Sequence, residues 1–167
     1  MQFKAATRED RGEILSLYRS LVGTEYCAWT ETYPGETEVE SDLSREALFC
    51  MRDRDGTLAG VISIDQDEEI EKLPCWTEAL QPSGELSRLG VKEAYQNRGL
   101  ARELLRCGME ELRRRGCKSV HFLVCKTNRK AIRSYEKLHF QIVGECRLFG
   151  EDWWCYEKAL AETADRA

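Results

Sequence analysis

The sequence predicts an α/β (α+β) fold in which short strands and helices alternate along one domain. Three observations support this fold class. Apolar segments of strand length recur between turn signals, two later segments carry apolar residues at helical spacing, and Asp55-Gly56 separates two apolar runs as a hairpin turn does. The 167 residues suit a single core, so we expect one domain over residues 1–160 and a mobile tail over 161–167.

The first half of the chain carries helix-start and hairpin signals. Thr7 followed by Asp10 resembles a capping box, and an amphipathic helix should follow it. In order, we expect a strand at 3–5, a helix that ends near 23, a loop over 24–40, a short helix capped by Ser41 or Ser44, antiparallel strands at 48–52 and 58–64, and an irregular connection over 65–84 with one helical turn near 76–80.

The second half is more regular. The strand at 85–91 does not alternate strictly between apolar and polar residues, which indicates a bulge. A helix should then run to residue 115, with Gly116 as its C-cap. We expect the remaining elements to be a strand at 119–124, a helix opened by Asn128, and a terminal hairpin formed by 140–149 and 153–160, turning at 150–152.

The step from the strand at 85–91 into the next helix predicts an anion site. A strand that turns into a helix leaves backbone N–H groups free at the positive end of the helix dipole. Gly99 and Ala101 would let an anion approach this backbone closely, and Arg98 and Arg102 add positive charge. The sequence contains neither the GxxxxGK[ST] phosphate loop nor GxGxxG at this place, so the anion is not presented in either of those ways.

Composition and charge restrict the class of protein. Charged residues make up 33% and apolar residues 42% of the chain, and no apolar run approaches membrane-spanning length. With no apolar signal core near its start, we expect a cytoplasmic protein whose eight cysteines are free thiols and which binds no metal. The overall net charge of −5 argues against a nucleic-acid partner, although residues 31–71 carry −10 and residues 96–133 carry +8.

Two motifs resemble a known family. Gln96-x-x-Gly99-x-Ala101 is similar to the acetyl-CoA pyrophosphate loop of the GNAT superfamily of N-acetyltransferases. That family's later helix commonly reads Asn-x-x-Ala-x-x-x-Tyr-x-x-x-Gly-Phe, and here Asn128, Ala131 and Tyr135 are followed by His139-Phe140. His139 departs from the family's glycine, at a helix end where a left-handed backbone is common and histidine is tolerated.

The resemblance extends over nearly the whole chain and implies a fold and a cofactor. It implies a mixed, mostly antiparallel sheet of six to seven strands, with helices on both faces and a splay between the fourth and fifth strands. It also implies that acetyl-CoA is the acyl donor, bound by Leu89, Gly90, Val91, Gln96, Asn97, Arg98, Gly99, Leu100, Ala101, Arg102 and Asn128.

The resemblance also implies how the transfer proceeds. The acceptor amine would attack the thioester directly in a ternary complex, with Tyr135 as the acid for the leaving thiolate. Glu85 is our candidate base, and a water chain is the alternative. Acceptor-facing residues of the family occupy the region of Trp29, Glu31 and Tyr33, where an aromatic and acidic lining suits a cation.

We therefore expect an N-acetyltransferase for a primary amine, either a small cationic molecule or the N-terminus or Lys of a peptide. A second hypothesis is an acyl-CoA-binding or sensor domain without turnover, and Glu85 together with Tyr135 favours catalysis over it. Transfer of a longer acyl group, or transfer to a hydroxyl, stays open. We expect no membrane partner, and a homodimer remains possible.

Overall fold

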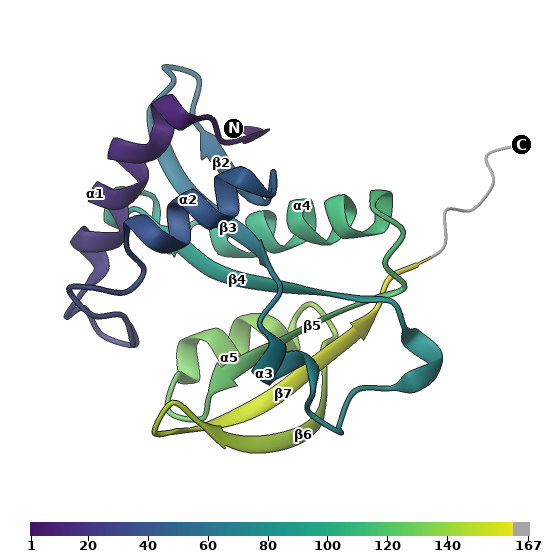
Figure 1. The fold of residues 1–167 in the computed structure, drawn as a ribbon. Helices are drawn as coiled ribbons and strands as arrows, with labels where there is room; N and C mark the ends of the chain where they lie inside the picture. The colour runs from purple at the N-terminus through teal and green to yellow at the C-terminus, as the bar shows by residue number, and fades with distance from the viewer. Residues whose placement is uncertain (162–167) are drawn as a thin grey trace, which may run out of the picture. The chain divides into compact units, whose positions relative to one another are not determined.

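The computed structural model describes residues 1–161 and shows a mixed α/β fold (Figure 1). The helices and strands in chain order are β1 (Gln2–Ala5), α1 (Arg11–Leu21), α2 (Glu36–Ser44), β2 (Leu48–Arg52), β3 (Leu58–Asp65), α3 (Glu68–Glu71), β4 (Ser83–Val91), α4 (Leu100–Arg114), β5 (Ser119–Cys125), α5 (Arg129–Glu136), β6 (Gln141–Leu148) and β7 (Glu151–Ala159). Three 3-10 turns lie between them, η1 (Arg8–Asp10), η2 (Glu78–Leu80) and η3 (Glu93–Tyr95). Of the expected tail, residues 162–167 lie outside the described residues.

The strands form one seven-stranded sheet in the order β1-β2-β3-β4-β5-β7-β6. The pairs β1–β2, β2–β3, β5–β7 and β6–β7 are antiparallel, whereas β4 and β5 are parallel. The paired residues of β4 and β5 are Ser83–Glu85 with 119–121. The mixed, mostly antiparallel sheet predicted from the sequence is therefore confirmed.

The chain divides into two compact units, which we describe separately. The first unit comprises Met1–Asp65 and Ser87–Gly108, and the second comprises Gln66–Leu86 and the chain from Met109 onward. The boundary falls within β4 and within α4, so each of these two elements contributes one end to each unit.

In the first unit, helices cover both faces of the strands. α1 and α2 contribute Ile14, Tyr18 and Val39 to a core that they share with Val61 of β3, and Figure 1 shows both helices against the same strands. Gly60, next to Val61, faces the opposite way, because a Cβ built there would lie 2.8 Å from Leu104 Cδ1 of α4. α4 can therefore approach the strand closely only where the side chain is missing.

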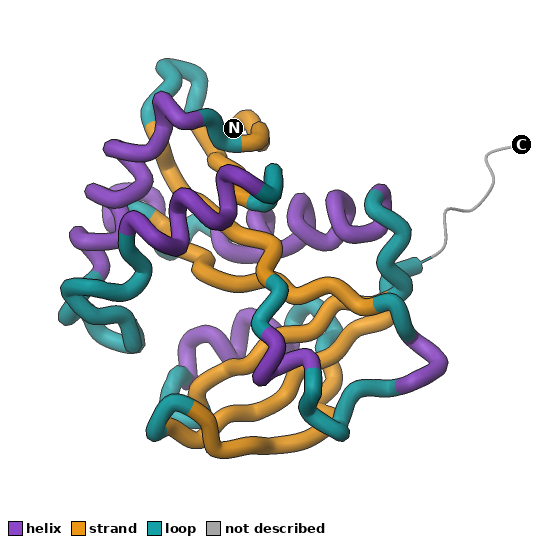
Figure 2. Tube along the Cα trace, in the orientation of Figure 1, coloured by secondary structure: helices purple, strands orange, loops and turns teal. Residues whose placement is uncertain are grey.

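In the second unit, neighbouring residues of β5 mark the two faces of the sheet. Phe122 packs in an aromatic cluster with Tyr135, Phe140 and Tyr156, with ring centroids 4.8–6.0 Å from that of Phe122. His121, one residue earlier, lies on the other face, where its ring is 4.6 Å from that of Trp76 in the connection before β4. Figure 2 shows β5, β7 and β6 running side by side.

Several sequence predictions of local structure are confirmed. Thr7 and Asp10 form the capping box of η1, and the β2–β3 hairpin turns at Asp55-Gly56. The Asn128 side chain accepts a hydrogen bond from the Ala131 N–H at 3.1 Å and caps α5. His139 has φ +62°, the left-handed backbone expected at that helix end.

Other local predictions were wrong. The expected loop over 24–40 ends at residue 35, since α2 starts at Glu36 rather than after Ser41 or Ser44. The N-cap residue, Gly35, has no side chain to cap the helix, and instead the Glu38 carboxylate accepts the Gly35 N–H at 2.7 Å. The connection before β4 contains a helical turn, α3, that we did not predict; Asp67 caps it. The last hairpin turns at Phe149-Gly150, both with positive φ, rather than at 150–152.

Candidate active site

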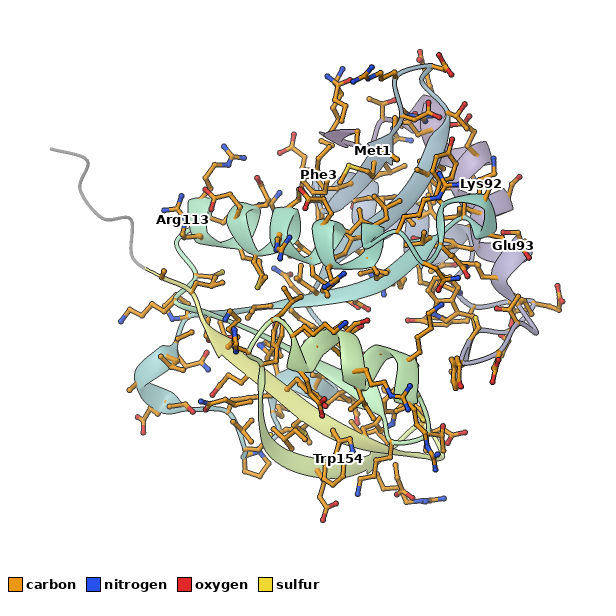
Figure 3. The ribbon with its side chains drawn as sticks, turned by 180° about the vertical axis from the view of Figure 1, so that it is seen from behind. Met1, Phe3, Lys92, Glu93, Arg113 and Trp154 are labelled. Atoms are coloured by element: carbon orange, nitrogen blue, oxygen red, sulfur yellow. The ribbon has the colours of Figure 1, made fainter. Side chains whose placement is uncertain are left out.

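Side-chain hydrogen bonds within the first unit stabilise the conformation of the loop between β4 and α4. Gln96 Nε2 donates to the Val91 carbonyl at 2.9 Å, and the Tyr95 hydroxyl donates to the Asp53 carboxylate. Asn97 and Gly99 both have left-handed backbones, with φ of +60° and +79°. Lys92 and Glu93, which are labelled in Figure 3, mark the start of this loop. These contacts and backbone angles define the turn into α4.

A cavity of about 390 Å³ opens at this loop in the first unit. Three arginines line it against a single acidic side chain, so the local charge is positive; the lining residues are Met1, Arg98, Gly99, Leu100, Arg102, Glu103 and Arg106. A Cβ added at Gly99 would lie 3.4 Å from Arg102 Nη2, on a backbone that side chains rarely adopt. The start of a helix, positive charge and a missing side chain together fit a diphosphate.

The end of β4 that belongs to the first unit carries Leu89, Gly90 and Val91. Gly90 lies close to α1 and to Trp29, since a Cβ there would be 3.2–3.3 Å from three side chains. Arg88, just before them, has φ +46°, which agrees with the irregularity predicted in this strand. The backbone of β4 therefore changes direction immediately before the residues expected to bind the cofactor arm.

Sequence reasoning missed the buried ionic network that holds Arg88. Its guanidinium contacts the Asp42 carboxylate of α2 and the Asp65 carboxylate of β3, each at 2.7 Å. Asp42 also accepts hydrogen bonds from Ser63 Oγ at 2.7 Å and from Arg45 at 2.6 Å. One sequence signal could have indicated this network. Asp42 lies three residues after Val39, on the helix face that is buried, and a buried carboxylate needs a charged partner.

The expected acceptor residues of the first unit differ in exposure. Trp29 packs edge-on against Tyr18, with centroids 5.1 Å apart, and so contributes to the core. Glu31 is exposed. Tyr33 is 43% exposed, and its hydroxyl accepts from Arg88 Nη1 at 3.4 Å. Desolvation raises the pKa of Tyr33, and Arg88 opposes that shift.

Tyr135 of the second unit is a neutral phenol. Its ring lies edge-on to those of Phe122, Phe140 and Tyr156, at 4.9–6.1 Å between centroids. Burial raises the pKa of Tyr135 to about 12, and Tyr156 adds to the shift. A phenol with this pKa is protonated at neutral pH, as a proton donor must be.

Glu85 lies on the other face of the second unit's sheet. It is 3% exposed, is opposite His121 in the β4–β5 register, and accepts the Asp67 N–H at 3.2 Å. Because His121 and Phe122 face opposite ways, Glu85 and Tyr135 are separated by the sheet. The structure therefore does not bring the two proposed catalytic side chains together on one surface.

His121 is a buried, uncharged histidine. Its Nδ1 is 2.6 Å from Ser83 Oγ, and its Nε2 has no hydrogen-bond partner among the described residues. Burial lowers the pKa of His121 to about 4, although the nearby Glu157 raises it in part. This geometry supports a structural histidine.

The neutral His121 predicts an acid sensitivity. Because the folded-state pKa of about 4 is below the ordinary value of 6.5, the unfolded chain protonates first as pH falls. Stability should decline between pH 6.5 and 4, by about 3 kcal/mol from this group. Urea unfolding at successive pH values measures this, and His121→Asn should flatten the slope.

The other histidine supplies the matched control for this prediction. His139→Asn retains a residue that tolerates the left-handed backbone and leaves His121 in place. It should keep the wild-type slope between pH 4 and 6.5. Identical slopes in the two variants would show that His121 is not the responsible group.

Residues 1–161 contain neither a helix that could span a membrane nor a cluster of metal-binding side chains. Each helix there is too short or too polar to cross a membrane. No group of three or more His, Cys, Asp and Glu side chains in the same range has the geometry to hold a metal ion.

Comparisons with known proteins point to one family. The profile of the acetyltransferase (GNAT) family matches residues 14–140. A mycothiol acetyltransferase of Thermomonospora curvata is 33% identical over 114 residues, which are 68% of this chain and 34% of that protein. This chain thus spans about a third or less of the length of the mycothiol acetyltransferases it matches.

Two further proteins are similar over nearly their full length. The spermine/spermidine N(1)-acetyltransferase of Bacillus subtilis is 25% identical over 152 residues, which cover 90% of this chain and 94% of that protein. The structure of yncA from Salmonella typhimurium, described with its cofactor acetyl-CoA, superposes with a TM-score of 0.73 at 19% identity, covering 98% of this chain and 96% of that one. The latter similarity shows a shared fold.

Proposed function

This chain belongs to the acetyltransferase (GNAT) family, and we propose that it transfers an acetyl group from acetyl-CoA to a primary amine. The observation that carries the proposal is the positive cavity at the start of α4, where Gly99 leaves the backbone open. Phosphate groups, such as those of a diphosphate, are bound well by helix N-termini and arginines.

In the first unit, two stretches hold the donor. The N–H groups of residues 96–102 bind the diphosphate, and the backbone of Leu89, Gly90 and Val91 bonds the pantetheine arm. In the second unit, Asn128 Oδ1 caps α5, which is a structural role, and a bond from Asn128 to the cofactor stays what the family resemblance implies. Acetyl-CoA supplies an activated acyl group, and the Leu89 N–H polarises its carbonyl.

The two proton transfers occur at atoms bonded to one carbon, whereas Glu85 and Tyr135 lie on opposite faces of the second unit's sheet, so Glu85 would have to act through a chain of waters. Glu85, or a water chain, takes a proton from the incoming ammonium, which frees the nitrogen lone pair for attack on the carbonyl carbon. Tyr135 gives its phenolic proton to the departing sulfur as the carbon–sulfur bond breaks. Tyr135 is protonated at neutral pH, as an ordinary tyrosine also would be, so its protonation state is compatible with this assignment.

The acceptor is a cationic amine. Residues 31–71 carry a net charge of −10, and Glu31 and Tyr33 are both exposed in that stretch. The similarity to a spermine/spermidine acetyltransferase supports the same class. Trp29 is partly buried and packs against the core, so its contribution would be to hold the loop rather than to contact the amine directly.

The test is a screen of amines, monitored by release of free CoA, with a loop variant as the donor-site control. Polyamines, amino acids, aminoglycosides and peptides with a free N-terminus or Lys cover the acceptor classes. Gly99→Val places a branched side chain at φ +79° beside Arg102 and should weaken acetyl-CoA binding about 100-fold in calorimetry.

Gly150→Val is the matched control for the loop variant. Gly150 has φ +75° and no atom within 4 Å of its added Cβ, so the backbone strain is equal but the site differs. It should lower stability and leave acetyl-CoA affinity within twofold. Wild-type affinity in Gly99→Val would remove the loop as the diphosphate site, and a screen without CoA release would remove catalysis.

A further inference from the structure

Three cysteines of the second unit gather on one face of the terminal hairpin. Cys155 lies on β7 and Cys146 on β6, and Cys75 lies in the connection between α3 and η2. All eight cysteines of the chain lie within the described part, and each is a free thiol there. The Cys155 thiol lies close enough to the thiols of Cys75 and Cys146 for both to affect its pKa.

Gly144 makes room for this cluster. It is the direct partner of Cys155 in the β6–β7 register. A Cβ built at Gly144 would lie 2.6 Å from Cys75 Cβ, 3.4 Å from Cys75 Sγ and 3.9 Å from Cys155 Cβ. The connection can therefore rest directly on the hairpin, with Cys75 above the strand and beside Cys155.

We propose that Cys75 and Cys155 are an oxidation site that a peroxide converts into an internal disulfide. Cys75, which is half-buried, reacts first with hydrogen peroxide to give a sulfenic acid and water. The buried Cys155 thiol then attacks the Cys75 sulfur, which forms the S–S bond and releases a second water. The two thiols lose two electrons and two protons, and the peroxide oxygens take them up.

Cys75 suits Cys155 better than Cys146 does. Cys146 is opposite Trp153, so Cys155 is its diagonal neighbour across the two strands. The Cβ atoms of diagonal neighbours on antiparallel strands stand somewhat less than about 7–8 Å apart, still well beyond the separation of about 3.8 Å that a disulfide requires, even where the thiols approach each other. Cys75 approaches from above the sheet and is not held at that spacing.

The surroundings of Cys155 favour the disulfide once it has formed. Cys155 is 0% exposed, and burial, followed by its contacts with Cys75, raises the pKa of its thiol. A thiol that ionises reluctantly is a poor leaving group, so external thiols reduce such a disulfide slowly. Oxidation should therefore persist under mild reducing conditions.

The disulfide would tie the connection 66–82 to β7. Trp76 and Thr77, next to Cys75, already contact this face, because Trp76 stacks on His121 and the Thr77 N–H donates to Glu157 at 3.0 Å. The added bond closes a long loop of chain and restricts the unfolded state. It should raise the melting temperature by roughly 5–10 °C.

The experiment oxidises the reduced full-length protein with one equivalent of hydrogen peroxide. Peptide mapping without reductant should recover a Cys75–Cys155 crosslink, and the count of reactive thiols in denaturant should fall from eight to six. Cys75→Ser should lose both the crosslink and the rise in melting temperature. Cys146→Ser, the matched control within the cluster, should keep both.

Three outcomes would overturn the proposal. They are an unchanged thiol count, a crosslink that joins Cys146 to Cys155, and a rise in melting temperature that persists in Cys75→Ser. The melting temperature of reduced Cys75→Ser shows that the variant is folded. These readouts do not depend on acetyl transfer, so the proposed function and this site can fail separately.

Discussion

Replacing Arg88 with methionine is expected to destabilise the protein by about 3 kcal/mol, because it removes one partner of a buried ionic network. The Arg88 side chain is 6% exposed and that of Asp42 is 1% exposed, so the carboxylate cannot be rehydrated without opening the fold. We place the value at the lower end of the range for such changes, since Arg45 and Ser63 stay hydrogen-bonded to Asp42. Urea unfolding at neutral pH measures it.

Arg45→Met is the matched control for this prediction. Arg45 contacts the same two carboxylates, at 2.6 Å and 3.8 Å, but its side chain is 27% exposed. Losing it should cost about 1 kcal/mol, as for an ion pair near the surface. Equal losses in the two variants would contradict the view that Arg88 is the buried centre of the network.

Replacing Tyr135 with phenylalanine is expected to lower kcat for acetyl transfer roughly 100-fold, with acetyl-CoA affinity within about twofold. The phenyl ring keeps the edge-on contacts with Phe122 and Phe140, so only the proton donor is lost. Steady-state kinetics gives kcat, and calorimetry gives the affinity. This prediction depends on the proposed function.

Tyr156→Phe supplies the matched control in the same aromatic cluster. The Tyr156 hydroxyl is buried and has no hydrogen-bond partner among the described residues, so its removal should leave both turnover and stability near wild type. Unchanged kcat in Tyr135→Phe would exclude Tyr135 as the acid. A drop in both variants would indicate that the cluster as a whole, rather than one phenol, matters.

Much of the fold could be predicted because its boundaries depend on local signals. The capping box of Thr7 and Asp10, the turn at Asp55-Gly56 and the cap of Asn128 on α5 each depend on side chains that act within a few residues. The start of α2 could not be predicted in this way, because Gly35 has no capping side chain and Glu38 caps it from inside the helix.

The site could be predicted only in part. The loop at Gly99 has a local signature, and the structure gives it a positive cavity. The contacts of Arg88 depend on residues 46 and 23 positions away along the chain, and a single sequence carries no information on such pairings. The placement of Glu85 and Tyr135 on opposite faces depends on the register of β4 with β5, which is equally remote.

The placement of Glu85 and Tyr135 on opposite faces of the second unit's sheet has a consequence for redesign. Substitutions near Glu85 are made away from the aromatic cluster, so they leave the packing of Tyr135 unchanged. Under the proposed function, variants with a different acceptor preference can therefore be sought without altering the surroundings of the proposed acid.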